Sequence, residues 1–256
     1  MRSPPGARLL IAALLMAAWP ASAQSSPELA EMYARGNYLA VASAAEASAG
    51  ADDLAFAARA LLAHCMTGTD DPDPTILDRA SKDAEAALRI DPSHDEGRLQ
   101  LAIALSLKSR GMDAMDAWNK GYGEKGRKLA TEVLKSNPAN YYAHGFLAVW
   151  NVEVRRRGGS IGAAFMGASI KEARRHYDEA IRLTPDNIGI HWTYGRALVA
   201  FNAKEYSEEA GKALSAALSS TPRNHVEQVM QERALMLSEK LKDDRKAAQS
   251  LARKML

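Results

Sequence analysis

The chain has 256 residues, a formal net charge of +2 and a hydrophobic fraction of 47%. Such a small charge surplus argues against general nucleic-acid binding, which needs many cationic side chains to neutralise phosphates. Cys65 is the sole cysteine, which excludes an internal disulfide, so packing has to hold the fold together.

The first residues have the pattern of a cleaved export signal. Arg2 and Arg8 flank the start of an apolar run of 10 residues, Leu9–Ala18, which is too short to cross a bilayer. An Ala-Ser-Ala sequence ending at Ala23 then fits a small-residue cleavage site. We therefore expect residues 1–23 to be removed and the rest to be a soluble periplasmic protein without a membrane span. A retained anchor is the alternative that the short run disfavours.

After the signal, the composition predicts helices and no strand. Ala, Leu, Glu, Lys and Arg dominate the long segments, and β-branched runs are absent. Ser26 and Pro27 are typical of the N-cap and first residue of a helix. A second helix is expected around Ala42 and Ala49, and a third over Asp52–Cys65.

From residue 80 onward, an apolar pattern with the spacing i, i+4, i+7, i+8 occurs four times, each time with a proline four residues further on. This spacing makes one narrow apolar stripe on a helix, and the proline ends that helix because it lacks an N–H and clashes with the preceding turn. The patterns begin at Ala80, Gly126, Ala173 and Ala210, and the prolines are Pro92, Pro138, Pro185 and Pro222.

A second landmark lies about ten residues after three of these prolines. It is a large residue followed by a small one, which lets two helices approach closely: Leu101-Ala102, Leu147-Ala148 and Tyr194-Gly195. With these landmarks in phase, the chain resembles the tetratricopeptide repeat (TPR) superfamily, as found in exported bacterial proteins; KEARRHYDEAIRLTPDN is similar to its second helix and turn.

The resemblance implies an all-α fold, a right-handed TPR-like solenoid of antiparallel helix pairs. We expect about five units over residues 24–222. His225–Leu241 and Asp244–Met255 are expected to form a terminal pair within residues 223–256. Glu232 stands there where a small residue is expected, which is typical of a capping pair rather than a repeat.

Two units are longer than the ~34 residues of a TPR repeat, by roughly a dozen residues each. The extra residues are predicted to be inserted loops at about Ser109–Lys125 and Arg155–Ser169, which emerge on the same edge of the solenoid. Glycines beside apolar residues in the second loop suit a mobile lid. This stretched plan is also similar to the regulator of microtubule dynamics family, through LAIALSLKSRG and GRKLATEVLKSNP. That similarity implies no reaction.

The stretch GYGEKG, at residues 121–126, matches the glycine spacing of a dinucleotide-binding loop. That motif has to follow a strand, and the preceding residues do not predict one. We interpret the stretch as the loop that enters a second helix, with Gly126 as its small packing residue.

Residues with catalytic or metal-binding chemistry form no recognisable constellation. None of the six histidines belongs to an H-E-x-x-H motif, and His64 and Cys65 are adjacent on a helix and so point apart. Cys65 is therefore expected to be a buried, inert thiol. We expect a protein that is not an enzyme and that needs neither a cofactor nor a metal.

The concave face of a TPR-like array is lined by the first helix of each unit. Exposed inner positions there are mostly apolar, which predicts a groove for a protein or peptide partner. The inner positions are Leu99, Ile103, Tyr142, Val149, Val152, Trp192, Arg196 and Val199. The two insertions are expected to add Trp118, Tyr122, Arg155, Phe165 and Met166.

The sequence thus predicts a non-enzymatic periplasmic scaffold with an apolar groove. For any single groove residue, packing against neighbouring repeats is the alternative. For the whole protein, the alternative is a carrier of a small hydrophobic ligand, a lipid or organic acid, in the service of a transporter.

Overall fold

A computed structural model describes residues 26–48, 50–68 and 71–256, so the predicted signal peptide lies outside the described residues. The described residues form thirteen α-helices and no β-strand, which confirms the all-α prediction. The helices are α1 (Pro27–Ala34), α2 (Tyr38–Ser48), α3 (Ala51–Thr67), α4 (Pro74–Ile90), α5 (Asp95–Arg110), α6 (Ala114–Asn119), α7 (Tyr122–Ser136), α8 (Tyr141–Met166), α9 (Ile170–Leu183), α10 (Ile188–Asn202), α11 (Ser207–Ser219), α12 (His225–Asp243) and α13 (Arg245–Lys254).

The helices that follow the four repeated prolines all begin in the same way. Each N-cap residue lies two positions after the proline, and its side chain accepts a hydrogen bond of 3.0 Å from the backbone N–H three residues further on. Such a bond satisfies one of the four N–H groups that have no partner within the helix. The caps are His94 for α5, Asn140 for α8, Asn187 for α10 and Asn224 for α12.

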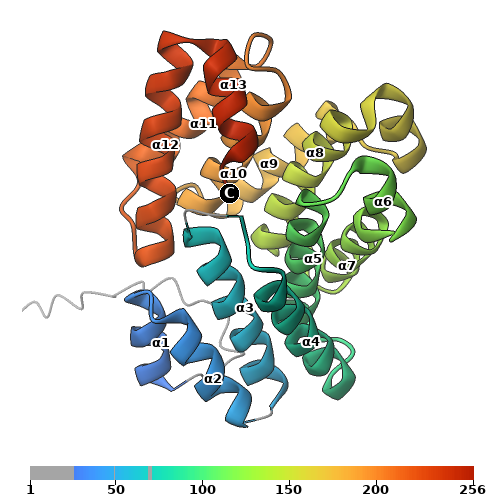
Figure 1. Cartoon of the computed structure of the whole chain (residues 1–256), viewed down its shortest axis with the longest axis vertical. Coiled ribbons are helices and arrows are strands. Elements are labelled where there is room, and N and C mark those ends of the chain that lie inside the picture. The colour runs from blue at the N-terminus through green and yellow to red at the C-terminus, as the bar shows by residue number, and fades with distance from the viewer. Residues whose placement is uncertain (1–25, 49, 69–70) are drawn as a thin grey trace, which may run out of the picture.

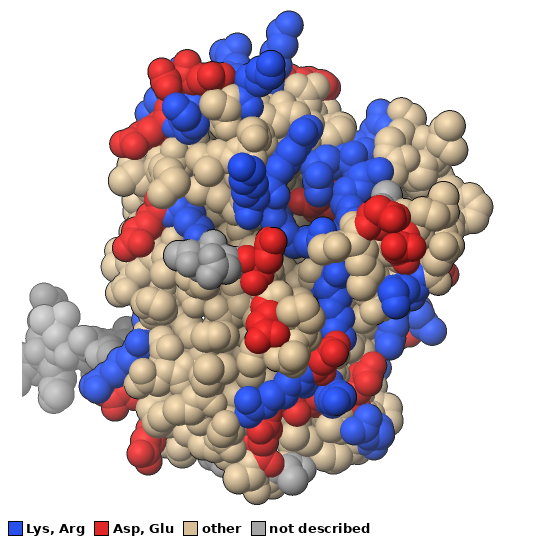
Figure 2. Space-filling view, in the orientation of Figure 1, with Lys and Arg blue, Asp and Glu red and all other residues tan. Residues whose placement is uncertain are grey.

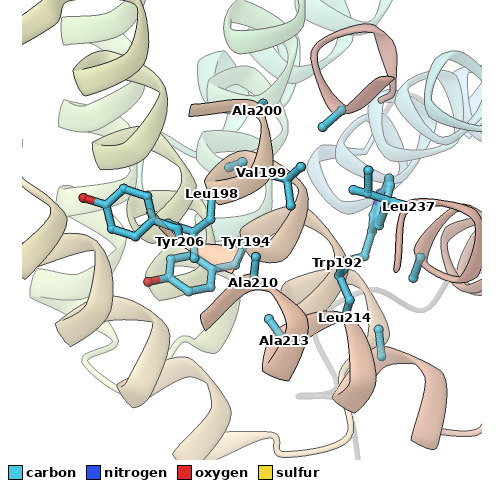
Figure 3. Packing of buried hydrophobic residues seen from close by; sticks show 14 of the residues in the cluster. Trp192, Tyr194, Leu198, Val199, Ala200, Tyr206, Ala210, Ala213, Leu214 and Leu237 are labelled. Atoms are coloured by element: carbon cyan, nitrogen blue, oxygen red, sulfur yellow. The ribbon is translucent and has the colours of Figure 1, made fainter. Parts of the chain in front are cut away.

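Neighbouring helices pack in pairs, the closest being α3 with α4, α8 with α9, and α10 with α11. Small residues permit this closeness. A Cβ added at Gly195 would lie 3.1 Å from Leu214 Cγ and 3.3 Å from the carbonyl oxygen of Ala210, so α10 and α11 would have to move apart. Trp192, Tyr194 and Leu214 are fully buried in the resulting core, which Figure 3 shows from close by.

The array of helix pairs curves until its two ends meet (Figure 1). Helix α12 contacts α10 and α11 and also α1 and α3 from the other end of the chain. Tyr38 Oη lies 3.1 Å from His225 Nδ1, and Arg233 Nη2 donates to the carbonyl of Gly68 at 2.6 Å. The described chain ends in the middle of this arrangement, between the helices that were expected to border an open groove.

The two insertions are largely helical, so the prediction of inserted loops was wrong. Helix α6 lies within the first insertion, and α8 continues through most of the second. The axis of α8 is broken at Gly159, whose φ of 62° and ψ of −160° are outside the helical region. Gly158 and Gly159 thus mark a kink in a helix and not a loop, because a residue without a Cβ accepts positive φ at little cost.

The GYGEKG stretch is mostly the first turn of α7, which begins at Tyr122, and no strand precedes it among the residues that the structure describes. Only Gly121, with φ of 65°, stands outside as the N-cap. A Cβ at Gly126 would come within 3.3 Å of Phe146 Cζ, so the prediction of a small packing residue at this position is confirmed. The expectation of a loop that extends to Gly126 was wrong.

No helix in the described part of the chain is both long enough and apolar enough to span a bilayer.

Candidate functional site

The inner helices α5, α8 and α10 do not present the predicted open groove. Their expected exposure is wrong at five positions, which are at most 6% exposed: Leu99, Val152, Trp192, Arg196 and Val199. Three others are half-buried: Ile103, Tyr142 and Val149. In this conformation the five buried side chains pack as core residues, which was the alternative for each of them.

The end of the described chain, Ala252–Leu256, covers part of this face at α10. Trp192 Nε1 donates to the carbonyl of Leu256 at 3.2 Å, and Arg196 Nη1 donates to that of Ala252 at 3.2 Å. In return, Arg253 Nε donates to the carbonyl of Ala200 at 3.0 Å. The segment therefore lies against α10 through hydrogen bonds to main-chain oxygens. We call residues 252–256 the C-terminal strap.

A second part of the predicted site lies in the open. Trp118 on α6 is 44% exposed and Phe165 near the end of α8 is 79% exposed, and their ring centroids are 5.1 Å apart. Met115 and Ile161, on the same two helices, are 66% and 88% exposed. We call these four residues the tip patch. Figure 1 shows α6 and the end of α8 projecting side by side from one edge of the molecule.

The base of the tip patch is held by hydrogen bonds to main-chain oxygens. Arg157 Nη2 donates to the carbonyl of Met112 at 2.7 Å, before α6, and Arg127 Nη1 donates to that of Met166 at 2.6 Å, at the end of α8. Trp150 Nε1 donates to the carbonyl of Gly123 at 2.8 Å. These bonds tie both ends of the tip to α7 and α8, so the exposed side chains stand on a supported base.

The remaining insertion residues of the predicted site lie below the tip patch. Tyr122 is half-buried against Leu101 and Leu105, and Met166 packs against Trp150. Arg155 Nη1 donates to Ser160 Oγ at 2.6 Å across the kink in α8. Of the five predicted insertion residues, the structure thus brings Trp118 and Phe165 together on the surface and uses the other three as support.

Sequence reasoning missed a buried hydrogen-bonded chain through two histidines. Arg175 Nη2 lies 2.8 Å from His176 Nε2, which has to accept because a guanidinium can only donate. Neutral His176 then carries its proton on Nδ1 and donates to His144 Nδ1 at 2.9 Å, and His144 Nε2 donates to the carbonyl of Pro138 at 3.1 Å. Burial, with the charge of Arg175, lowers the pKa of His176 to about 4.

A signal for this arrangement was present in the sequence. His144 and His191 each stand four residues after an asparagine cap and six after a repeated proline. His191 Nε2 bonds the carbonyl of Pro185 at 2.8 Å, as His144 does that of Pro138. Both histidines therefore make the same hydrogen bond across the turn that follows a repeated proline.

The other reactive groups are arranged without a shared site. Cys65 is buried while His64 is exposed, which confirms that the two side chains point apart. Burial raises the pKa of the Cys65 thiol to about 11, so the nucleophilic thiolate is disfavoured. Within residues 26–48, 50–68 and 71–256, no group of three or more His, Cys, Asp or Glu side chains is placed to hold a metal ion.

Comparison of the sequence with models of protein families and with curated proteins gave no match.

Proposed function

We propose that the protein is a non-catalytic, exported binding protein of the TPR type, which recognises a partner protein through the tip patch. The observation that carries the proposal is the exposure of apolar side chains there. Eight large hydrophobic side chains of the described residues are exposed, and four of them form the tip patch. Contiguous exposed apolar patches on soluble proteins mark contact sites.

The chemistry of the four side chains supports a protein as the partner. Tryptophan and other aromatic residues supply much of the binding energy at protein interfaces, and methionine adapts its shape to the surface it meets. The tip patch spans two short stretches of helix that lie beside each other. An apolar helix face or another apolar segment of a partner fits such a surface.

The regular placement of proline, cap and small residue supports the TPR-type architecture in its right-handed form. Export rests on the pattern of residues 1–23. The sequence predicted partner binding at the inner face, but the C-terminal strap and the core packing leave five of its eight predicted side chains buried. We therefore assign partner binding to the tip patch instead.

The carrier of a small hydrophobic ligand remains the alternative. Two hollows in the surface of the described residues are lined mostly by polar and charged side chains. One, of about 530 Å³, is bordered by Asp52, Asp95 and Glu96, and the other by Arg174, Glu205 and Glu208. Neither of these two hollows suits a lipid tail.

Site-specific photocrosslinking tests the proposal. A photoreactive phenylalanine analogue at position 165, on the tip patch, is expected to crosslink a discrete partner in periplasmic extract. The same analogue at Leu235 on α12, which is 50% exposed, is the matched control and is expected to give no such product. Replacing Trp118 by serine in the position-165 protein is expected to reduce the yield several-fold.

Equal crosslinking at positions 165 and 235, or none at either, would contradict a tip-directed partner. Native mass spectrometry of the protein purified from cells addresses the alternative. A lipid or organic acid that stays bound during purification, together with no crosslinked product at position 165, would establish the carrier function instead.

A further inference from the structure

Four arginines from three helices gather around a single glutamate beside the C-terminal strap. Glu153 on α8 accepts from Arg156 at 2.7 Å, on the same helix, and from Arg196 on α10 at 3.0 Å. Arg110, at the end of α5, interacts electrostatically with all three of these side chains. Arg157 completes the group next to Arg156. We call the four arginines the arginine cluster.

The strap that lies on this cluster is itself basic. Arg110 Nη2 donates to the carbonyl oxygens of Met255 at 2.6 Å and Arg253 at 3.3 Å, so the strap backbone is in direct contact with the cluster. The strap carries Arg253 and Lys254, both exposed. Figure 2 shows Lys and Arg groups gathered over the middle of the face where Figure 1 places the end of α13 near α5 and α8.

Three carboxylates act on Arg110 and Arg157 of the arginine cluster. Besides Glu153, the acidic groups acting on it are Asp71, towards Arg110, and Asp113, towards Arg157. The strap adds the cationic side chains of Arg253 and Lys254. Burial, together with the charges of Arg196 and Arg156, lowers the pKa of Arg110 to about 10.

Hydrogen-bond donors remain available at the seam between cluster and strap. Arg196 uses both of its terminal nitrogens in hydrogen bonds, to Ala252 and Glu153. Arg157 likewise uses both of its terminal nitrogens, to Ser109 and Met112. Among contacts between described residues, Arg110 Nε and Nη1, both Nη atoms of Arg253 and Nζ of Lys254 have no hydrogen-bond partner. Guanidinium forks match the oxygens of carboxylates and phosphates.

We propose that the seam between Arg110 and the strap residues Arg253 and Lys254 is a binding site for an anion with at least two negatively charged oxygens. A phosphate or a di- or tricarboxylate has this chemistry. Such an anion bridges α5 to the strap, adds to the hydrogen bonds that Arg110 makes to the strap backbone, and holds the strap on the inner face. A monovalent ion cannot serve both sides in this way. The site is separate from the tip patch and does not depend on the proposed partner.

The test titrates the whole protein with sodium pyrophosphate and, separately, with citrate at constant ionic strength, using sodium chloride as the reference salt. Calorimetry is expected to show saturable binding, with the tighter of the two anions identifying the ligand as a phosphate or a carboxylate. Loss of two cations in the Arg253→Gln/Lys254→Gln variant should weaken binding roughly tenfold. Arg110→Gln should weaken it to a similar extent.

Arg182→Gln is the matched control, because Arg182 on α9 is an exposed arginine outside the cluster and its side chain is 64% exposed. This variant is expected to bind the anion like the wild type. Hydrogen exchange at the end of α13 gives a second readout and should slow on binding. Because Arg253 and Lys254 are exposed, their variant remains informative if Arg110→Gln fails to fold.

Three results would overturn the proposal: no saturable binding of either anion, equal loss of affinity in the Arg182→Gln control, or an effect that sodium chloride reproduces. A Trp118→Ser variant is expected to bind the anion normally. Failure of partner crosslinking at the tip patch would therefore not contradict the anion site. Failure of anion binding would likewise not contradict the partner site.

Discussion

At His176 a buried side chain is held in its neutral form by its neighbours. Arg175 donates to one ring nitrogen, and the other nitrogen donates to His144. A second proton on His176 would have to displace the bond from Arg175 and would place a charge beside that guanidinium. Of the charged groups acting on His176, only Glu172 favours protonation, and burial outweighs it.

The lowered pKa predicts a loss of stability in acid. The unfolded chain binds a proton at position 176 near pH 6.5 and the folded protein near pH 4, so this residue removes stability as the pH falls between the two. The loss is up to about 1.4 kcal/mol per pH unit. Asn at position 176 does not titrate and keeps a donor towards His144, so His176→Asn should flatten the dependence.

Urea unfolding between pH 7 and pH 4 measures the difference between the variant and the wild type, with His64→Asn at an exposed histidine as the control. The comparison is needed because Asp83 acts in the opposite direction. Burial and Glu46 raise the pKa of Asp83 to about 7, so that carboxyl favours folding more at low pH. An unchanged slope in His176→Asn would mean that the ring is free to take up a proton in the folded state.

At the scale of single helices, the repeated caps decide where each unit begins. Asn187 is 3% exposed, and its side chain accepts from the backbone N–H of Ile190 at 3.0 Å at the start of α10. That N–H is buried and has no other partner within the helix. Alanine at this position would leave it unsatisfied, whereas serine or aspartate can still accept the bond.

Asn187→Ala is expected to lower the free energy of unfolding by about 1–2 kcal/mol. Asn187→Ser and Asn187→Asp are expected to retain most of the wild-type value, and guanidinium denaturation of the three variants provides the measurement. If serine were as costly as alanine, the role of Asn187 would lie in its packing and not in the cap.

Helix α8 combines a predicted helix and the predicted inserted loop that follows it in the chain. A loop was predicted over about Arg155–Ser169, but α8 is only kinked at Gly159, and the helical pattern resumes beyond the kink and carries Ile161 and Phe165 into solvent. Residues 160–166 are apolar or small, so they form a helix as readily as a loop. The pattern could not separate these two outcomes, because helix formation there depends on support from Arg127 and Trp150 at the base of the tip.

For the whole molecule, the meeting of the two ends is the decisive feature. Arg233 on α12 donates to the carbonyl oxygens of Met66 and Gly68 at the end of α3, and to that of Leu256 at 3.2 Å in the strap. One side chain thus joins three parts of the chain. Burial lowers the pKa of Arg233, which reflects the cost of placing its charge there among neutral oxygens.

Replacing Arg233 by methionine keeps an unbranched side chain that can pack in place of the arginine stem and removes all of its donors. This change should cost on the order of 1 kcal/mol because three part-buried or exposed main-chain oxygens lose a charged hydrogen-bond donor. Hydrogen exchange should become faster in α3, α12 and the strap and stay unchanged in α7. Faster exchange spread evenly over all helices would show general destabilisation and would contradict a local role in closing the array.

The sequence alone determined the helix ends and the pairing of successive helices, which depend on residues close together in the chain. Helix ends follow from prolines and caps, and the close pairing of helices follows from small residues at a fixed phase, because both involve groups a few positions apart or in successive helices. Even the exposed pair Trp118 and Phe165 could be named in advance, since each is apolar within an insertion.

Only the tertiary structure decided that the inner face is covered. Tyr38 and His225 meet across 187 residues, and the strap reaches Arg110 across 145. Such contacts depend on the small rotation of each helix pair relative to the preceding pair, accumulated along the whole array. A local sequence pattern does not determine this accumulated rotation. A modest change in each rotation would leave the ends apart and the groove open with the same helices.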